Sequence, residues 1–309
     1  MTSRSSSFCA LALAALFCLL PASPAAAFEE RLLLPDGTLV VANAERFVLY
    51  DASRSPARLG GALSADRLAG DHDFKRTQQL LSGTFIAAWI GPKPAADDAP
   101  GTGDYTLPRY IYSLASSYVT TLATPPVMRR LAARLRAQGQ PAWAKFCDAV
   151  AANESGHEDQ LILDLNALGL DGEAFLRAVR PPAATALVAH FNRLVDSDQP
   201  VAAVGYVYAL QRSSLLLDKE ITARIEALIP TGINASRSLR THGGTGGNAR
   251  HVEETEKFVS TLPADARRAV ALAMYQTIGM MLGPDDFPGD AAAERTIGNF
   301  KVAPHRARP

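Results

Sequence analysis

The sequence predicts a mainly α-helical protein with a small β-strand segment near its N-terminus. Two observations support this prediction. From residue 65 to residue 282, apolar residues recur at the spacing of one helix face, and proline and glycine interrupt them where helices are expected to end. Residues 28–60 instead contain short β-prone runs around Pro35-Asp36-Gly37, a tripeptide that favours a tight turn.

The same signals predict the order of the elements. RLLLPDGTLVVAN predicts a small N-terminal β-hairpin, and ERFVLYD could add a third strand packed on the helical body. Residues 91–104 and 231–248 are expected to be loops. Because proline disrupts a helix interior, Pro125 and Pro126 are expected to separate two helices. The helices expected in chain order cover residues 65–90, 105–123, 127–138, 142–170, 171–179, 183–196, 199–230, 249–262 and 264–282.

Composition divides the chain into four parts. Residues 1–27 contain one early positive charge, an apolar run from Phe8 to Leu20 and small residues before Phe28, which predicts a secretory signal peptide cleaved after Ala27. Residues 28–64 form the β-prone segment, residues 65–282 the helical bundle domain, and residues 283–309 a flexible tail. We therefore expect a periplasmic or secreted protein.

Charge and cysteine content exclude several classes of function. The chain has 31 Lys and Arg residues against 31 Asp and Glu residues, and no basic stripe, so we expect no binding to nucleic acid. No apolar run beyond the leader approaches the roughly 18 residues of a membrane span, so no membrane insertion is expected. Cys147 would be the only cysteine left after cleavage, so an internal disulfide is not expected.

The clearest chemical pattern lies in the long helix expected from Ala142 to Leu170. Glu154 and His157 are three residues apart, so their side chains project from nearly the same helix face. A carboxylate and an imidazole at this spacing form half of a site for a divalent metal. The same spacing also occurs on solvated helix faces, so the pair alone leaves both interpretations open.

Three later positions could complete such a site. Gln211 lies in an apolar helix, where a polar side chain needs a partner. His242 precedes a glycine-rich run, and His251 lies at the start of the helix that follows it, with Glu254 one turn further on. These residues belong to separate helices, so a shared site requires the helices to pack with their polar faces together.

The order of these features resembles the heme-oxygenase-like fold, in its TenA/PqqC-related branch of iron-containing redox enzymes (diiron oxidases and oxygenases). That family carries a Glu-x-x-His pair on one core helix, a later helix similar to Gly-Tyr-x-Tyr-x-Leu-Glu, and a final helix with His-x-x-x-Asp-x-x-His. The corresponding segments are the pair at 154 and 157, GYVYALQ at 205–211 and THGGTGGNARHVEE at 241–254. The resemblance implies a helical bundle of that fold over about residues 105–282.

The chain departs from the family pattern at three positions. Gln211 stands where the family has a carboxylate, Asn248 where it has the aspartate, and Gly244 where it has the preceding histidine. Amides bind divalent iron only weakly, so these departures argue against a two-iron centre.

What the resemblance implies instead is a single iron ion. Its ligands would be Glu154, His157 and His251, with His242 as a fourth if the glycine run folds back. On the middle helix, the resemblance implies Gln211 and Tyr208 as catalytic positions.

Two functions remain open at this stage. The first is an exported iron-dependent oxidase or oxygenase that acts on a small organic substrate. The second is a metal-free helical binding or scaffold protein that keeps the fold and has lost the catalytic site, with Gln211 bonded to Glu154 or His157 in a polar core. The resemblance also implies a homodimer.

Overall fold

The computed structural model describes residues 29–51, 72–91, 105–217, 219–242, 247–284 and 286–302, without the side chains of residues 72, 242 and 247. The predicted signal peptide, most of the loop expected at 91–104, the His242 side chain and the glycine run at 243–246 lie outside the described residues. The elements are β1 (Glu30–Leu33), β2 (Leu39–Ala42), β3 (Phe47–Tyr50), α2 (His72–Ile90), α3 (Leu107–Ala137), α4 (Pro141–Glu154), α5 (His157–Ala167), α6 (Gly172–Ala178), α7 (Pro182–Asp196), the short 3-10 helix η3 (Pro200–Ala203), α8 (Val204–Ser214), α9 (Lys219–Glu226), α10 (Arg237–His242), α11 (Gly247–Ser260), α12 (Ala264–Met281) and α13 (Asp290–Gly298).

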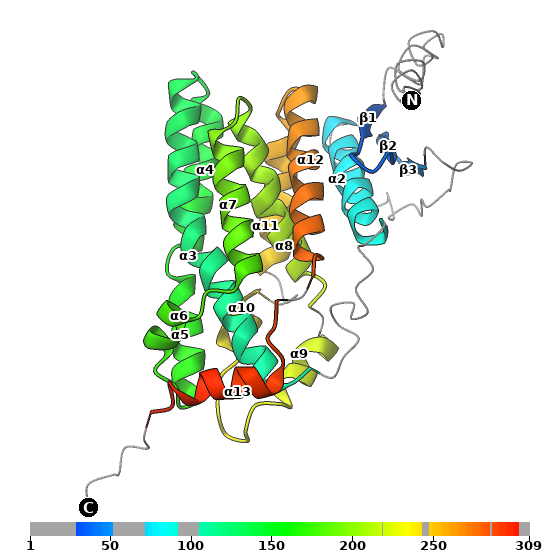
Figure 1. Ribbon diagram of the computed structural model, residues 1–309. Coiled ribbons are helices and arrows are strands. Elements are labelled where there is room, and N and C mark those ends of the chain that lie inside the picture. The colour runs from blue at the N-terminus through cyan, green and yellow to red at the C-terminus, as the bar shows by residue number, and fades with distance from the viewer. Residues whose placement is uncertain are drawn as a thin grey trace, which may run out of the picture.

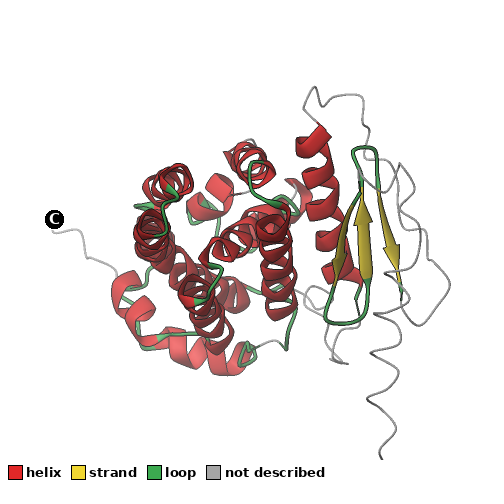
Figure 2. Ribbon diagram, turned by 90° about the horizontal axis from the view of Figure 1, so that it is seen from above, coloured by secondary structure: helices red, strands yellow, loops and turns green. Residues whose placement is uncertain are grey.

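The N-terminal segment forms a three-stranded antiparallel sheet, with strand order β1-β2-β3. The turn between β1 and β2 contains Gly37 at φ 88°, a conformation that favours glycine. One face of the sheet packs on α2 at the edge of the bundle, as Figure 2 shows. At Gly83 of α2, an added Cβ would lie 2.8 Å from the Phe47 ring, so helix backbone and sheet are in close contact. The predicted mainly α fold with a small N-terminal β segment is confirmed.

Helix α3 corrects the prediction that prolines would separate two helices. It continues through Pro125 and Pro126 as a single helix of 31 residues. Each proline removes a donor from the helical ladder, and prolines commonly bend a helix where this happens. Figure 1 shows α3 changing direction part-way along its length. Pro125 is buried together with Val127 and Met128, so tertiary packing holds the helix together across a sequence that would break it in isolation.

The single helix expected over 142–170 is also corrected, because it is two helices. α4 ends at Glu154, and α5 begins at His157. Between them, Gly156 adopts φ 88°, which lies outside the helical region and favours glycine. The predicted Glu-x-x-His pair therefore spans a helix break instead of one continuous helix face. The end predicted near Gly169 is confirmed, since this residue has φ 77° after the last turn of α5.

Three further expectations are corrected in the C-terminal half. The segment expected to be a loop over 231–248 contains helix α10. The long helix expected over 199–230 is divided into η3, α8 and α9. The segment expected to be a flexible tail contains α13, which packs on α3 with Ala293 and Ile297 buried. After α13 the backbone N–H of Asp171 donates to the carbonyl of Phe300 at 2.8 Å, which ties this segment to the start of α6.

The buried side chains form two apolar clusters. The larger one joins the sheet and α2 to α4, α7, α8, α11, α12 and the second half of α3. The smaller one joins the first half of α3 to α5, α6, α9 and α13. A buried ion pair, with Arg267 Nε 2.9 Å from Glu30 Oε2, connects α12 to β1. Among the described helices, none combines the length and apolar character that a membrane span requires.

Candidate functional site

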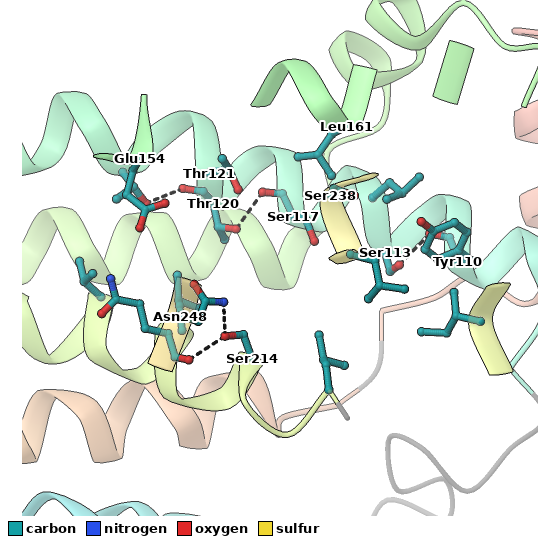
Figure 3. Close-up of a pocket in the computed structure, with 18 of the residues that line it drawn as sticks. Tyr110, Ser113, Ser117, Thr120, Thr121, Glu154, Leu161, Ser214, Ser238 and Asn248 are labelled. Atoms are coloured by element: carbon teal, nitrogen blue, oxygen red, sulfur yellow. Dashed lines mark hydrogen bonds between the residues drawn. The ribbon is translucent and has the colours of Figure 1, made fainter. Parts of the chain in front are cut away.

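A pocket of about 340 Å3 lies between α3 and α8, where the two apolar clusters meet (Figure 3). One wall is a stripe of hydroxyl-bearing residues on α3, and the opposite wall comes from α8 and the start of α11. Glu154, at the end of α4, lies at one end of the pocket, and Tyr110 lies toward the other. We call this the hydroxyl pocket. The α3 stripe consists of Tyr110, Ser113, Ser117, Thr120, Thr121 and Thr124.

The α3 stripe follows from helix geometry. Positions 110, 113, 117, 120, 121 and 124 are separated by three or four residues, apart from one adjacent pair, so they lie along one helix face. At about 1.5 Å per residue, the stripe from Tyr110 to Thr124 is roughly 20 Å long. Ser117 is exposed, whereas Tyr110 and Thr124 are buried, so the ends of the stripe are less accessible to solvent than its middle.

Most of the pocket hydroxyls donate their protons to the protein. On α3, Ser113 Oγ donates to the carbonyl of Tyr110 at 2.7 Å, and Thr124 Oγ1 donates to that of Thr120 at 2.9 Å. Thr120 Oγ1 likewise donates to the carbonyl of Ser117 at 3.0 Å, and Tyr110 Oη to that of Ala235 at 2.7 Å. Serine and threonine within helices commonly bond in this way to the preceding turn. Their oxygens thus remain in the pocket as hydrogen-bond acceptors.

The opposite wall is a short network of polar side chains. Asn248 Nδ2 donates to Ser214 Oγ at 2.6 Å, and Ser214 Oγ donates to the carbonyl of Gln211 at 2.7 Å. The hydroxyl of Thr255 donates to Gln211 Oε1 at 3.2 Å, so the amide of Gln211 is oriented by α11. The polar Gln211 that the sequence placed in an apolar helix is therefore buried with a partner.

A smaller pocket of about 290 Å3 adjoins the first. Glu154 and Gln211 line both pockets, so they form the boundary between them. His251 and Glu254 line the smaller pocket from α11, with His251 Nδ1 3.4 Å from Glu254 Oε2. Three of the positions predicted from sequence, Glu154, Gln211 and His251, therefore come from separate helices to one pocket.

His157 contacts Glu154 but does not reach the same pocket. Its Nδ1 lies 3.2 Å from Glu154 Oε2, and it lines neither pocket. The contact with the Glu154 carboxylate raises the pKa of His157 above its usual value, although partial burial opposes this. His157 lies outside the pockets because the helix breaks after Glu154, and His157 begins a new helix with a different direction.

The iron site that the resemblance implied stays a prediction. Within the described parts of the chain, no three His, Cys, Asp or Glu side chains gather closely enough to hold a metal ion. The groups instead form two pairs, Glu154 with His157 and His251 with Glu254. The side chain of the fourth expected ligand, His242, lies outside the described residues.

Tyr208, expected as a catalytic position, lines neither pocket. Its hydroxyl donates to Glu256 Oε1 at 2.7 Å, and Gln78 Nε2 donates to the other oxygen of Glu256 at the same distance. Burial is the largest cause that holds the pKa of Tyr208 well above its usual value, with the Glu256 charge second. This side chain ties α8 to α11 behind the pocket. Cys147 is buried, and burial raises its pKa to about 12.

The hydroxyl stripe is the part of the site that the sequence interpretation missed. Its signal was present, since serine and threonine recur at helical spacing from Ser113 to Thr124 on the same helix as buried apolar residues.

Comparisons with known proteins address the fold. No family model matches the chain, and no curated protein sequence matches it. Among solved structures, the chain is similar to a domain of unknown function with a heme oxygenase-like fold from Shewanella denitrificans OS217. The two share 16% sequence identity with a TM-score of 0.55, over 75% of this chain and 94% of that chain.

The fold is heme oxygenase-like. The predicted fold is thereby confirmed, with the β segment added at its N-terminus. Similarity at this level of identity concerns the fold alone, so membership of the TenA/PqqC-related branch stays a prediction.

Proposed function

We propose that this chain binds a small organic molecule in the hydroxyl pocket, as a metal-free binding protein. The observation that carries the proposal is the pocket itself, about 340 Å3 in volume, between helices that are otherwise closely packed. Ligand sites in helical bundles are concave, mainly apolar, and contain a few polar groups that fix the orientation of the ligand. Leu114, Leu161 and Val207 supply the apolar surface here, and Gln211 and Asn248 are buried polar groups beside it.

A pair of substitutions on neighbouring positions of α3 tests this proposal. Thr121→Phe would fill the pocket, whereas Leu122→Phe changes an exposed position just outside it. Hexanol, hexylamine and hexanoate serve as probes of equal length that differ in charge, with binding measured by isothermal titration calorimetry. At least one probe should bind the unmodified chain and Leu122→Phe, and its binding should be lost in Thr121→Phe. Equal binding to all three proteins, or binding to none, would reject a ligand site here.

The iron-dependent oxidase or oxygenase implied by the resemblance is the second candidate. One observation favours it: Glu154 and His251 line the same smaller pocket, from α4 and α11. The purified chain would be incubated with Fe(II) under anaerobic conditions, and bound metal measured after gel filtration. Iron close to one equivalent, lost in His251→Ala and kept in His190→Ala, would favour the oxidase. If both variants bind iron equally, or if no iron is bound, the oxidase is rejected and the metal-free binding protein remains the proposed function.

Export of the chain is a separate proposal, supported only by the leader-like composition of residues 1–27. Expression of the full chain in a bacterial host, followed by N-terminal sequencing of the periplasmic fraction, tests it. The expected first residue is Phe28. An intact N-terminus in the cytoplasmic fraction would contradict export.

A further inference from the structure

The charge and the hydrogen-bonding groups of the hydroxyl pocket restrict the class of ligand that it can bind. We propose that the pocket takes an organic amine, bound as its ammonium cation with the charged group beside Glu154 and its hydrocarbon part directed toward Tyr110. This inference rests on the proposed function, since it assumes that a molecule occupies the pocket at all.

The first argument is charge. Among the described residues, Glu154 is the one charged side chain that lines the hydroxyl pocket, and no described lysine or arginine lines either of the two adjoining pockets. The Glu154 side chain is 14% exposed, so its charge is only partly screened by solvent. The smaller pocket behind it adds a second carboxylate, Glu254, and a single imidazole, His251. Glu254 is paired with Arg250, whose Nε lies 3.6 Å from Glu254 Oε1, but Arg250 lines neither pocket. An anionic ligand in the hydroxyl pocket would meet the Glu154 carboxylate, with no guanidinium or ammonium group among the described residues that line the pocket.

The second argument is the direction of the hydrogen bonds. The hydroxyls of Thr120 and Thr124 give their protons to carbonyls of α3 itself, and Ser214 gives its proton to the carbonyl of Gln211. These groups face the pocket as acceptors. An ammonium group has three donors and no acceptor, so it matches such a surface, whereas a carboxylate or phosphate is acceptor-only and does not.

The third argument is the distribution of polar and apolar groups along the pocket. In Figure 3, Glu154 and Thr120 lie toward one end and Tyr110 toward the other, with Ser113 and Ser117 between them. Tyr110 belongs to the smaller apolar cluster, as does Leu161, which lies nearer the middle of the pocket. A charged group at one end and a hydrocarbon chain along the rest would satisfy both regions.

His157 is the side chain that already contacts the Glu154 carboxylate, at 3.2 Å from Oε2. Because it lies outside both pockets, it holds the carboxylate from behind and leaves the pocket itself open. Glu154→Gln is therefore the suitable test variant, since glutamine keeps the length and an oxygen of the side chain while it removes the charge.

The three probes of equal length test the ligand class. Hexylamine is expected to bind at least about tenfold more tightly than hexanol, and hexanoate the most weakly, because a charge-assisted hydrogen bond is stronger than a neutral one. Glu154→Gln should remove the preference for hexylamine and leave the affinity for hexanol within about twofold. Glu253→Gln, an exposed carboxylate on α11 that lines neither pocket, is the control and should retain the preference.

The outcomes separate this inference from the proposed function. If hexanol or hexanoate binds as tightly as hexylamine and Thr121→Phe blocks it, the pocket is a ligand site and the amine class is wrong. If hexylamine is preferred but Glu154→Gln keeps that preference, the assigned position of the ammonium group is wrong. If no probe binds the unmodified chain, both the pocket as a ligand site and the amine class are overturned.

Discussion

The two sides of helix α8 differ in how much space they leave. On the side that faces α12, Gly205 lies very close to the α12 backbone. A Cβ added at Gly205 would collide with the carbonyl of Val270 and lie 2.8 Å from the backbone N of Met274. On the side that faces α3, Val207 and Gln211 line a pocket of about 340 Å3. The same short helix is therefore in backbone contact on one side and lines open space on the other.

This difference shows how a small bundle keeps a pocket open. Close-packed protein interiors leave few voids larger than a water molecule, so a pocket of this size requires rigid walls. α8 supplies such a wall because its packed side is fixed by the contact of Gly205 with α12 and by Tyr208, whose hydroxyl donates to Glu256. The packed side should then be sensitive to small substitutions, and the pocket side tolerant of them.

The largest effect is expected at Gly205. Gly205→Ala should lower the free energy of unfolding by about 3 kcal/mol, because the methyl group would force two helix backbones apart. Urea denaturation of the purified chain measures it. Gly279→Ala, on α12 itself, is the control: an added Cβ meets no described atom within 4 Å there, so stability should be unchanged or rise by about 0.5–1 kcal/mol. If both variants were equally stable, the close contact of α8 with α12 would be wrong.

Two tyrosines on α8 give the next effect. Tyr208→Phe should lower the free energy of unfolding by about 1–3 kcal/mol, because the buried carboxylate of Glu256 would lose the donor at 2.7 Å. Tyr206→Phe is the matched control, since the Tyr206 hydroxyl is buried without a hydrogen-bond partner among the described residues. Its stability should be unchanged or slightly higher. Equal losses from the two variants would show that the Tyr208 bond contributes nothing specific.

Two histidines should give pH effects of opposite sign. The pKa of His157, at the start of α5, is raised by Glu154, so its contribution to stability is full below about pH 6.5 and is lost as pH rises through the raised pKa. The pKa of His190, on α7, is lowered by burial and by Arg193. Its neutral form is the one the fold accepts, so stability is full above about pH 6.5 and is lost as pH falls toward the lowered pKa.

Unfolding free energies measured across this pH range check the two signs. His157→Gln should lose about 1 kcal/mol or less relative to the unmodified chain at acid pH, and the difference should shrink at alkaline pH. For His190→Gln the pH dependence is opposite: the free energy of unfolding of the variant should rise relative to that of the unmodified chain as pH falls. Parallel pH curves for all three proteins would contradict both pKa directions.

The smallest stability effect is expected from the α3 wall of the pocket. Thr121→Ala should change the free energy of unfolding by no more than about 0.5 kcal/mol, because the side chain borders open space and is only half-buried. Thermal unfolding would measure it beside Gly205→Ala. A loss comparable to that of the glycine variant would remove the contrast between the two sides of α8.

Local patterns were sufficient for much of the fold. The turn at Pro35-Asp36-Gly37 and its flanking strands, the helix at Ala264–Met281 and the break after Gly169 follow from signals within a few residues. One failure has a tertiary cause. At Pro125 and Pro126 a local signal for a helix end was overridden by burial against other helices.

Part of the candidate site could also be predicted from the sequence. Glu154, Gln211 and His251 were expected to converge, and they line one pocket from three helices. His157 was expected beside them and instead begins a new helix, because Gly156 adopts a left-handed conformation. Helix periodicity gives the face of a residue within its own helix, and a single change of direction breaks that relation.

The sequence by itself determined that this chain is a helical bundle with a short β meander, because hydrophobic periodicity and turn residues act over a few positions. It also determined that hydroxyl side chains recur along one face of α3. Only the tertiary structure decided that this face borders a pocket, and that Glu154 lies at the end of it. Those facts depend on how α3, α4 and α8 cross, which is fixed by close contacts such as that of Gly205 with α12 between residues far apart in the chain.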